Sequence, residues 1–331
     1  MKKLSKEFRI IAMALIGLCL AVTLSAKDIR INFLATGCNT VFDSIVVLNQ
    51  SKNIEVTVSG SSSLLLSDSA LSSGVDPNLV ILAYEIGDQL VYRAFAGKNT
   101  TIIVDSPKRN KEVNVQFVEC VDIDGNHYAV VKIGTQTWMA ENLRVTKYNN
   151  GDLISSMNSC ESWKTLNQGA QCSFNNTQSV DTIIKYGRLY NWFAVADHRK
   201  LAPKGWHVPT DKDFIVLETY VNYNLGNSMN TAKALASHSD WVKYRKPGTV
   251  GKDMEKNNSS GFSAKPAGFR CNSNGKFLLM GDYGYFWSST ENVAVGAWVR
   301  GLDFRSDLVV GGNGCKLHGY SVRCILDKQK K

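Results

Sequence analysis

Aromatic side chains are concentrated in one stretch of the chain, GDYGYFWSSTEN, where glycines separate some of the rings. Tyr283 and Tyr285 flank a glycine, with Arg270 upstream and Asn292 downstream, and these four residues are the candidate ligand-binding residues. Exposed aromatic clusters mark interaction sites. We expect a surface that stacks on sugar rings or docks a protein, with Trp287 placed in the core instead.

A second stretch, IGTQTWMAENLR, places Trp138, Glu141, Asn142 and Arg144 close together in sequence. Such residues could build an active site or a platform for a sugar. A buried indole, however, removes a large apolar area from water, and its polar neighbours can then satisfy backbone groups and charges. We therefore interpret this stretch as core scaffold.

Residues suited to acid–base or metal chemistry are sparse. The histidines lack HExxH-like spacing and no CxxC occurs, so neither a zinc protease nor a structural zinc site is supported. Asp122, Asp124 and Asn126 resemble the beginning of a calcium loop, but Ile133 occupies its twelfth position, where glutamate is needed. We expect a turn there and predict no catalytic residue, metal site or cofactor; the sequence leaves calcium binding elsewhere open.

Residues 1–26 have the pattern of a secretory signal, in which basic residues precede an apolar run that ends near Ser25 and Ala26. Cleavage after Ala26 is the expected processing. A membrane anchor is an alternative, although the run is shorter than the roughly 20 residues that cross a bilayer. Lipidation at Cys19 is another, although the bulky Leu18 precedes it. We expect export to the cell surface, the outer membrane or the extracellular medium.

The cysteines beyond the signal are disulfide candidates, because exported chains meet oxidising conditions. Eleven residues separate Cys160 from Cys172, and the chain-entropy model assigns about 3 kcal/mol to a bridge that closes a loop of this order. Three pairs are predicted and one cysteine is left over: Cys160 with Cys172, Cys271 with Cys315, Cys120 with Cys324, and Cys38 alone.

The charge balance argues against nucleic acid as a partner. The formal charge is +9, of which the signal contributes +3 (four basic residues against Glu7), leaving +6 for the mature chain. This excess is spread along the sequence, and no basic block is interleaved with aromatic residues.

The length of the mature chain favours two domains. Residues 27–106 contain short segments of alternating polar and β-branched or aromatic residues, such as DSIVVLN and QLVYRAFAG, which predict an all-β antiparallel sandwich. We place a boundary in SPKRNKE, residues 106–112, where charge rises and apolar periodicity stops.

Residues 113–327 have a different composition, since all seven tryptophans lie between Trp138 and Trp298. Helical spacing predicts one helix over 186–199 and another that begins at Thr210, whose hydroxyl and Asp213 three residues later form an N-cap signal. Strand-like segments follow Asn258. The pattern predicts an α+β arrangement.

Six ordered blocks resemble the Fibrobacter succinogenes major paralogous domain, a family of exported bacterial proteins, over residues 118–327: VKIGTQTWMAENLR, YGRLYNWFAVAD, LAPKGWHVPTDKDF, GFSAKPAGFR, YGYFWSSTEN and GYSVRCILD. The resemblance implies a C-type-lectin-like fold, with two helices packed on a small antiparallel sheet and long loops. A basic tail, residues 328–331, follows it. The N-terminal part looks like a small β-sandwich that often precedes such domains.

The block WHVPTDKDF is also similar to the helix start of formylglycine-generating, sulfatase-modifying enzymes. In those enzymes two cysteines separated by four residues handle copper and substrate, whereas eight residues separate Cys315 from Cys324 here, so the catalytic pattern does not carry over. The proline-containing triplet of calcium-dependent lectins is also absent from WSSTEN.

The resemblance therefore implies an exported, surface-associated, non-enzymatic binding or adhesion module. Its expected partner is a carbohydrate or a cell-surface protein, with peripheral or outer-membrane association. The alternative is an enzyme related to the formylglycine-generating class.

Overall fold

The computed structural model describes residues 28–60, 62–68, 78–225 and 230–328. The predicted signal, with Cys19 and Ala26, and most of the basic tail lie outside the described residues. Within the described part of the chain, no helix is long and apolar enough to cross a membrane.

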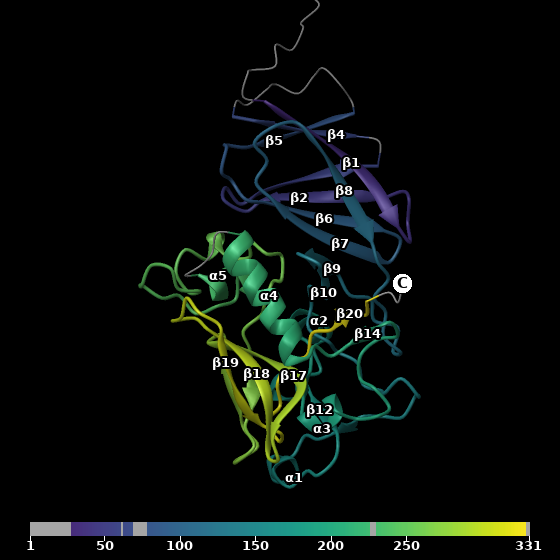
Figure 1. Cartoon of the computed structure of the whole chain (residues 1–331), viewed down its shortest axis with the longest axis vertical. Helices are drawn as coiled ribbons and strands as arrows, with labels where there is room; N and C mark the ends of the chain where they lie inside the picture. Colours follow the sequence, from purple (N-terminus) through teal and green to yellow (C-terminus); the bar gives the residue numbers. More distant parts are fainter. Residues whose placement is uncertain (1–27, 61, 69–77, 226–229, 329–331) are drawn as a thin grey trace, which may run out of the picture.

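Eight strands form an N-terminal β region, residues 28–117 (Figure 1). One sheet, in the order β5-β4-β1-β8, contains β1 (Ile29–Gly37), β4 (Ser63–Ser67), β5 (Leu79–Ala83) and β8 (Lys111–Phe117). The others belong to a larger sheet: β2 (Ser44–Asn49), β3 (Ile54–Ser59), β6 (Leu90–Ala96) and β7 (Asn99–Asp105).

Period-two burial explains why these segments form strands. In β2, Ile45 and Val47 are fully buried, while Ser44, Val46 and Leu48 beside them are partly exposed. Side chains from both sheets, among them Leu64 of β4 and Val47 of β2, meet in one apolar core. The expected strands are therefore present, but the expectation of purely antiparallel pairing is wrong, because β1 pairs with β8 and β4 with β5 in parallel.

The larger sheet continues beyond the N-terminal β region. Its full order is β14-β20-β10-β9-β7-β6-β2-β3, and β9 (Val130–Ile133) pairs in parallel with β7. The segment 106–112 leads into β8, which returns to β1. Because one sheet runs through both parts of the chain, the division into two domains stays a prediction.

The C-terminal region, residues 118–328, contributes the remaining strands. The larger sheet receives β10 (Gln136–Met139), β14 (Trp206–His207) and β20 (Ile325–Leu326). A small sheet holds β11 (Ser155–Ser156), β12 (Ala170–Cys172) and β13 (Leu189–Tyr190). A five-stranded sheet has the order β16-β15-β17-β18-β19, formed by β15 (Ala267–Arg270), β16 (Phe277–Met280), β17 (Tyr283–Val293), β18 (Gly296–Asp303) and β19 (Val310–Cys315).

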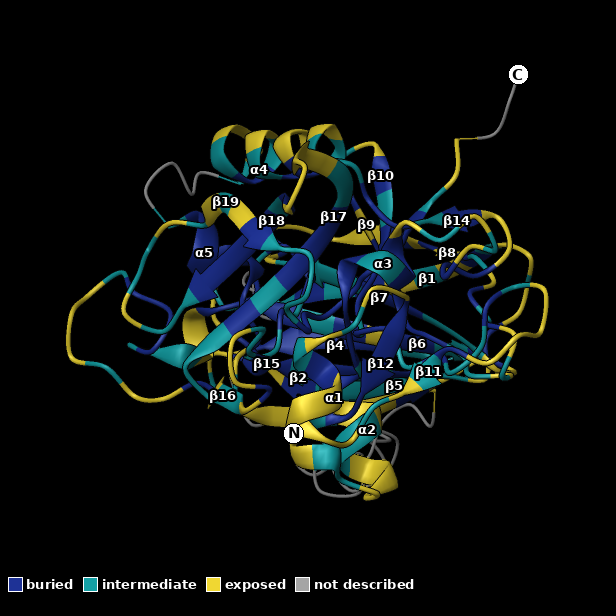
Figure 2. Cartoon of the chain, turned by 90° about the horizontal axis from the view of Figure 1, so that it is seen from below, coloured by how far each residue is buried: buried dark blue, intermediate teal, exposed yellow. Residues whose placement is uncertain are grey.

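Helices are short and few among the described residues: α1 (Cys160–Lys164), α2 (Val180–Tyr186), α3 (Trp192–Val195), α4 (Asp211–Asn224), α5 (Thr231–Leu235) and two 3₁₀ turns, Phe174–Asn176 and Met254–Lys256. The predicted cap of α4 is confirmed. The Thr210 hydroxyl accepts from the Asp213 N–H at 3.2 Å, and the Asp213 carboxylate accepts from the Thr210 N–H at 2.9 Å. One face of α4 is buried and the opposite face is exposed (Figure 2).

The expected α+β, C-type-lectin-like fold class is wrong, because the described chain is mainly β, with 39% strand and 14% helix. The single helix predicted over 186–199 is absent. Gly187 ends α2 at a φ of 75°, and a Cβ there would lie 2.5 Å from that of Asn142. The chain then forms β13 and the short α3 instead.

Two further cores lie on the two faces of the five-stranded sheet. Consecutive side chains on a strand point to opposite faces, and Phe286 and Trp287 accordingly belong to different apolar clusters. Trp138 is fully buried against Phe214 and Phe262, with ring centroids 5.4 and 5.6 Å away. The interpretation of IGTQTWMAENLR as core scaffold is confirmed.

Candidate functional site

Two predicted ligand-binding residues, Tyr283 and Tyr285, lie side by side at the beginning of β17. They are two positions apart, so both rings project from the same face of the strand. Their centroids are 5.5 Å apart and the ring planes differ by 3°. Both side chains are partly exposed, as expected, and their role in binding a ligand stays a prediction.

The two tyrosines continue into a larger aromatic cluster, which we define as Tyr283, Tyr285, Phe269, His318 and Tyr320. The Tyr285 ring meets Phe269 edge to face at 5.6 Å and Tyr320 at 5.0 Å. The His318 ring lies 5.5 Å from Phe269 and 5.2 Å from Tyr320. Tyr320 is only 6% exposed and forms the base, whereas the other four rings are partly exposed.

Strand pairing explains how residues distant in sequence form this cluster. β15, which ends at Arg270, is bridged through Arg270 to Gly319, and this bridge brings Phe269 to the segment that carries His318 and Tyr320. Opposite Tyr285, the pairing position on β18 is Gly301, where a Cβ would lie 2.9 Å from the tyrosine ring. A side chain at that position would displace the ring.

A charged pair borders the aromatic cluster. The Arg305 guanidinium donates to the Asp303 carboxylate at 3.1 Å and to the Tyr283 hydroxyl. Burial opposes ionisation of Asp303, but hydrogen bonds from Arg305 outweigh it and lower the pKa of that carboxyl. Tyr283 is thereby held by its hydroxyl, so its ring is already oriented before any ligand binds.

Ionisable groups inside the aromatic cluster are neutral near pH 7. Burial raises the pKa of Tyr285 to about 12 and lowers the pKa of His318 below its ordinary value. Nδ1 of His318 accepts from the backbone N–H of Asn272 at 3.2 Å. The cluster therefore offers ring faces and neutral polar edges, with its only charges on the Asp303–Arg305 pair at the border.

Arg270 does not join this surface, and the expectation that it binds ligand is wrong. Its side chain is fully buried, and the guanidinium donates to the carbonyls of Asn158 and Ser159 at 3.0 Å each. It lies over the rings of Trp163 and Phe277, at 4.4 and 4.8 Å. Its donors are used within the protein, so Arg270 is a structural cross-link.

Asn292 is exposed but lies near the other end of β17, beyond a register shift, and the structure does not bring it to the tyrosines. Its side chain donates to Oδ1 of Asn313 at 3.4 Å. The four candidate residues therefore divide into one adjacent pair, one buried cross-link and one separate exposed amide.

The cysteines of the described chain carry free thiols, so the three predicted disulfides are not formed in this structure. Cys172 is buried, and burial raises its pKa to about 11, whereas Cys160 is exposed at the start of α1 and directs its thiol to the Gly275 carbonyl at 3.3 Å. The side-chain amide of Asn272 donates to the Cys315 sulfur at 3.2 Å. Cys120 and Cys324 are buried in the same core.

Asp122 forms a turn, as expected. Its carboxylate accepts from the backbone N–H groups of Asp124 and Asn126, both at 3.0 Å, and from the Tyr128 hydroxyl. Within the described ranges, no group of three or more histidine, cysteine or acidic residues is placed to hold a metal ion.

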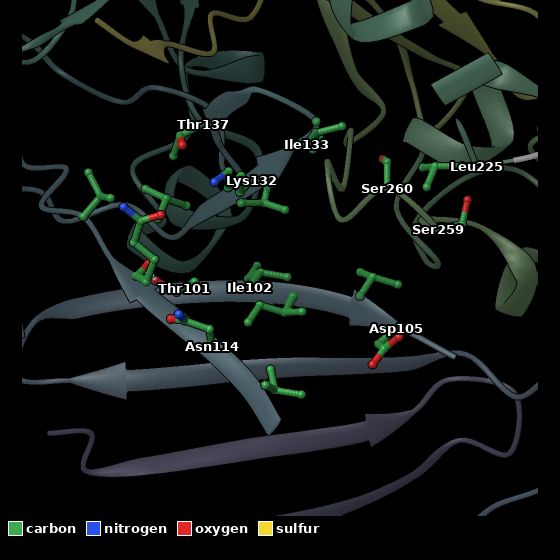
Figure 3. Close-up of a pocket in the computed structure, with 18 of the residues that line it drawn as sticks. Thr101, Ile102, Asp105, Asn114, Lys132, Ile133, Thr137, Leu225, Ser259 and Ser260 are labelled. Atoms are coloured by element: carbon green, nitrogen blue, oxygen red, sulfur yellow. Dashed lines mark hydrogen bonds between the residues drawn. The ribbon is translucent and has the colours of Figure 1, made fainter. Parts of the chain in front are cut away.

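A groove of about 760 Å³ lies where β7 and β8 approach β9 (Figure 3). An ion pair between Lys111 and Asp105, 2.8 Å apart, lies on its wall, and Ser259 and Ser260 line the side formed by the C-terminal region. The described residues that line it include neither histidine nor cysteine. We assign the groove no catalytic role; it marks the joint between the two regions.

Sequence reasoning did not identify Phe269, His318, Tyr320 or Arg305 as functional residues. Phe269 and Tyr320 lie in the blocks GFSAKPAGFR and GYSVRCILD, which indicated the family but not a role in binding. Their aromatic character was the available signal, but only the pairing of distant segments places them beside Tyr285.

The comparison with family models places these blocks in a known family. The model of the Fibrobacter succinogenes major domain matches residues 131–326. This range covers more than half of the chain, and the protein belongs to that family, as the six blocks indicated. No curated protein and no solved structure matches the chain significantly.

Proposed function

We propose that this member of the Fibrobacter succinogenes major domain family is an exported, surface-associated binding module that acts without catalysis. Its ligand-contacting surface is the aromatic cluster centred on Tyr283 and Tyr285. One observation supports this proposal above the others: two partly exposed tyrosine rings stand in parallel on a buried aromatic base.

The chemistry of the cluster suits binding. Tyrosine rings provide a large contact area and have few rotatable bonds. The hydrogen bond from Arg305 already orients Tyr283, so little side-chain entropy is lost when a ligand binds. Hydroxyls on the rings both donate and accept hydrogen bonds. The proposed ligand is a carbohydrate or the surface of a cell-surface protein, because both combine apolar faces with polar edges.

The export part of the proposal depends on the sequence of residues 1–26. Mass spectrometry of the protein from its own cells should find an N-terminus at Lys27, or a lipid on Cys19 if the alternative processing operates. Full-length protein recovered from the cytosol would refute export.

The binding part is tested with the mature chain on an array of glycans and cell-surface proteins. A ligand that binds without being consumed is expected. Replacing Tyr283 and Tyr285 together by alanine should weaken binding at least about tenfold. Tyr223→Ala is the matched control, because this tyrosine is 81% exposed on α4.

Equal binding by the double variant and the wild type would exclude the aromatic cluster as the site. Conversion of the bound ligand to a product would favour the enzymatic alternative. Loss of folding in the double variant would show that the two rings are part of the core. In that case Arg305→Ala tests the same surface, because Arg305 is exposed and its replacement removes the hydrogen bond to the Tyr283 hydroxyl.

A further inference from the structure

Six of the seven tryptophans are buried, and each donates its indole N–H within the protein. Examples are Trp163 to the carbonyl of Leu317 at 2.8 Å and Trp287 to the carbonyl of Tyr190 at 2.8 Å. The others are Trp138, Trp192, Trp206 and Trp241. Burial with a satisfied N–H is the ordinary arrangement of a core indole.

Trp298, in β18, departs from this arrangement. It is partly exposed and belongs to none of the apolar cores that hold the other six. Among the described residues, nothing accepts a hydrogen bond from its indole N–H. The ring of Trp298 is therefore accessible for apolar contacts, and its N–H is free to donate a hydrogen bond to a ligand.

Two exposed amides accompany this indole. Asn313 of β19 is the pairing partner of Trp298, and paired residues project from the same face of a sheet. Asn292 donates to Oδ1 of Asn313 at 3.4 Å, which holds both amides beside the strand. The Asn292 oxygen and the Asn313 amide hydrogens have no other partner among the described residues, so both a donor and an acceptor are free.

The charged residues beside the site are paired with one another, and one neighbouring position has no side chain. The next residue of β19 on the same face is Gly311, which has no side chain to cover the indole. Arg300, two residues along β18, is already paired with Asp211 at 2.7 Å and Glu218 at 2.5 Å. Glu291, the residue before Asn292, is likewise paired with Lys316 at 3.0 Å. Because these neighbouring charges already have partners, the site favours a neutral ligand.

We infer that Trp298, Asn292 and Asn313 form a binding site for a neutral sugar. The C–H face of a pyranose ring packs on an aromatic ring, while hydroxyls, which both donate and accept, match the indole N–H and the amides. A protein surface is less well matched, because it would have to leave several of these polar groups unpaired or wet.

This site is distinct from the aromatic cluster. Gly301, opposite Tyr285, and Trp298 are three positions apart on β18, so the two sites project from opposite faces of the sheet. The inference deepens the proposed function by naming a class of sugar. It rests on different residues, so the site at Trp298 and the aromatic cluster can be refuted independently of each other.

Saturation-transfer NMR on the mature full-length chain with cellotriose, xylotriose, mannotriose and N-acetylated chitotriose tests the site. At least one of these neutral trisaccharides should receive magnetisation. Trp298→Ala should reduce affinity at least tenfold, and Trp298→Phe, which keeps a ring but lacks the N–H, should reduce it less. The Tyr283→Ala, Tyr285→Ala double variant should bind the same trisaccharide with unchanged affinity.

Asn313→Ala provides a second test if Trp298→Ala does not fold, because the asparagine is exposed, and it should weaken binding about three- to tenfold. The inference is overturned if no trisaccharide binds the wild type or if Trp298→Ala and Asn313→Ala bind as the wild type does. If only the tyrosine double variant loses trisaccharide binding, the sugar occupies the aromatic cluster and not this site.

Discussion

The N-terminal β region and the C-terminal region are ordered by different interactions. In the described residues of 28–117, no charged side chain is buried, and the core is formed by apolar side chains from two facing sheets. The C-terminal region buries Arg270 and Arg323 completely and Lys233 almost completely. Each of these cations donates to backbone carbonyls of segments that have no regular structure.

This difference shows how a chain with few helices can order long loops. Regular strands satisfy their own backbone groups, and apolar burial is then sufficient to stabilise them. Loops leave carbonyls that need donors from elsewhere, and a guanidinium supplies several from one side chain. We therefore expect the N-terminal β region to tolerate changes of apolar shape, and the C-terminal region to be sensitive to loss of a single buried donor.

The largest effect is expected from Arg323→Met. The guanidinium donates to Asn142 Oδ1 and the Ser263 carbonyl, both at 2.8 Å, and to the Phe262 carbonyl. Leaving these buried acceptors unpaired should lower the free energy of unfolding by about 3 to 5 kcal/mol. Denaturant titration of the variant measures this loss.

Arg245→Met is the matched control, since Arg245 is exposed, and it should change stability by less than about 0.5 kcal/mol. Arg323→Lys should recover only part of the loss, because an ammonium cannot reproduce the planar set of donors. A loss below about 1 kcal/mol for Arg323→Met would contradict the contrast between the regions.

Leu64→Ala should have the next largest effect. Leu64 is fully buried in the core of the N-terminal β region, and a cavity there should cost about 2 to 4 kcal/mol. Leu64→Met keeps the volume and should cost less than about 1.5 kcal/mol. Leu34→Ala, at a leucine 46% exposed on β1, is the control for thermal unfolding. If Leu64→Met were as costly as Leu64→Ala, shape would matter here more than we expect.

Asp240 gives a pH-dependent test of the C-terminal region. Burial alone would raise its pKa, but hydrogen bonds from Lys185 and Lys265 lower it to about 2. Because the folded pKa lies below the unfolded value, this carboxylate stabilises the fold above about pH 4, and its contribution is lost as the pH falls towards 2.

Asp240→Asn should therefore cost about 1 to 2 kcal/mol at pH 7, after allowance for solvent screening, and the difference from the wild type should shrink below pH 4. Urea titrations between pH 7 and pH 2 measure it. A difference that stays constant across this range would show that the ion pairs with the two lysines contribute nothing.

The smallest effect is expected at the contact between the regions. Gln50 donates to the Asn257 carbonyl at 2.6 Å and Gln89 donates to it at 2.9 Å. Replacing both glutamines by alanine should cost about 1 kcal/mol and speed hydrogen exchange in the Met254–Lys256 turn and the residues after it. Gln116→Ala, at an exposed side chain, is the control. Unchanged exchange would mean that these bonds do not couple the regions.

The prediction of strands in the N-terminal β region succeeded because period-two burial is a local property. The pattern of β2 specifies which side chains face the core regardless of what forms the other side. The sequence did not predict which strands pair with one another, since the parallel pairing of β1 with β8 joins segments some eighty residues apart.

In the C-terminal region, too, predictions that depend on neighbouring residues were confirmed, and those that depend on distant contacts were wrong. α4 begins at Thr210 because the cap and the first turn lie within four residues. The helix expected over 186–199 failed where Gly187 must approach Asn142, and no local pattern reveals that contact. The candidate tyrosines lie together because they are two residues apart on one strand, whereas Arg270 and Asn292 were grouped with them only by sequence distance.

The sequence by itself determined the family, the alternation of the first strands, the cap of α4 and the pairing of Tyr283 with Tyr285, because each depends on residues close together in the chain or on the order of blocks. Only the tertiary structure decided that Arg270 is enclosed while Trp298 is left open to solvent. Burial and hydrogen-bond satisfaction depend on which distant segments meet, and that is a property of the whole fold.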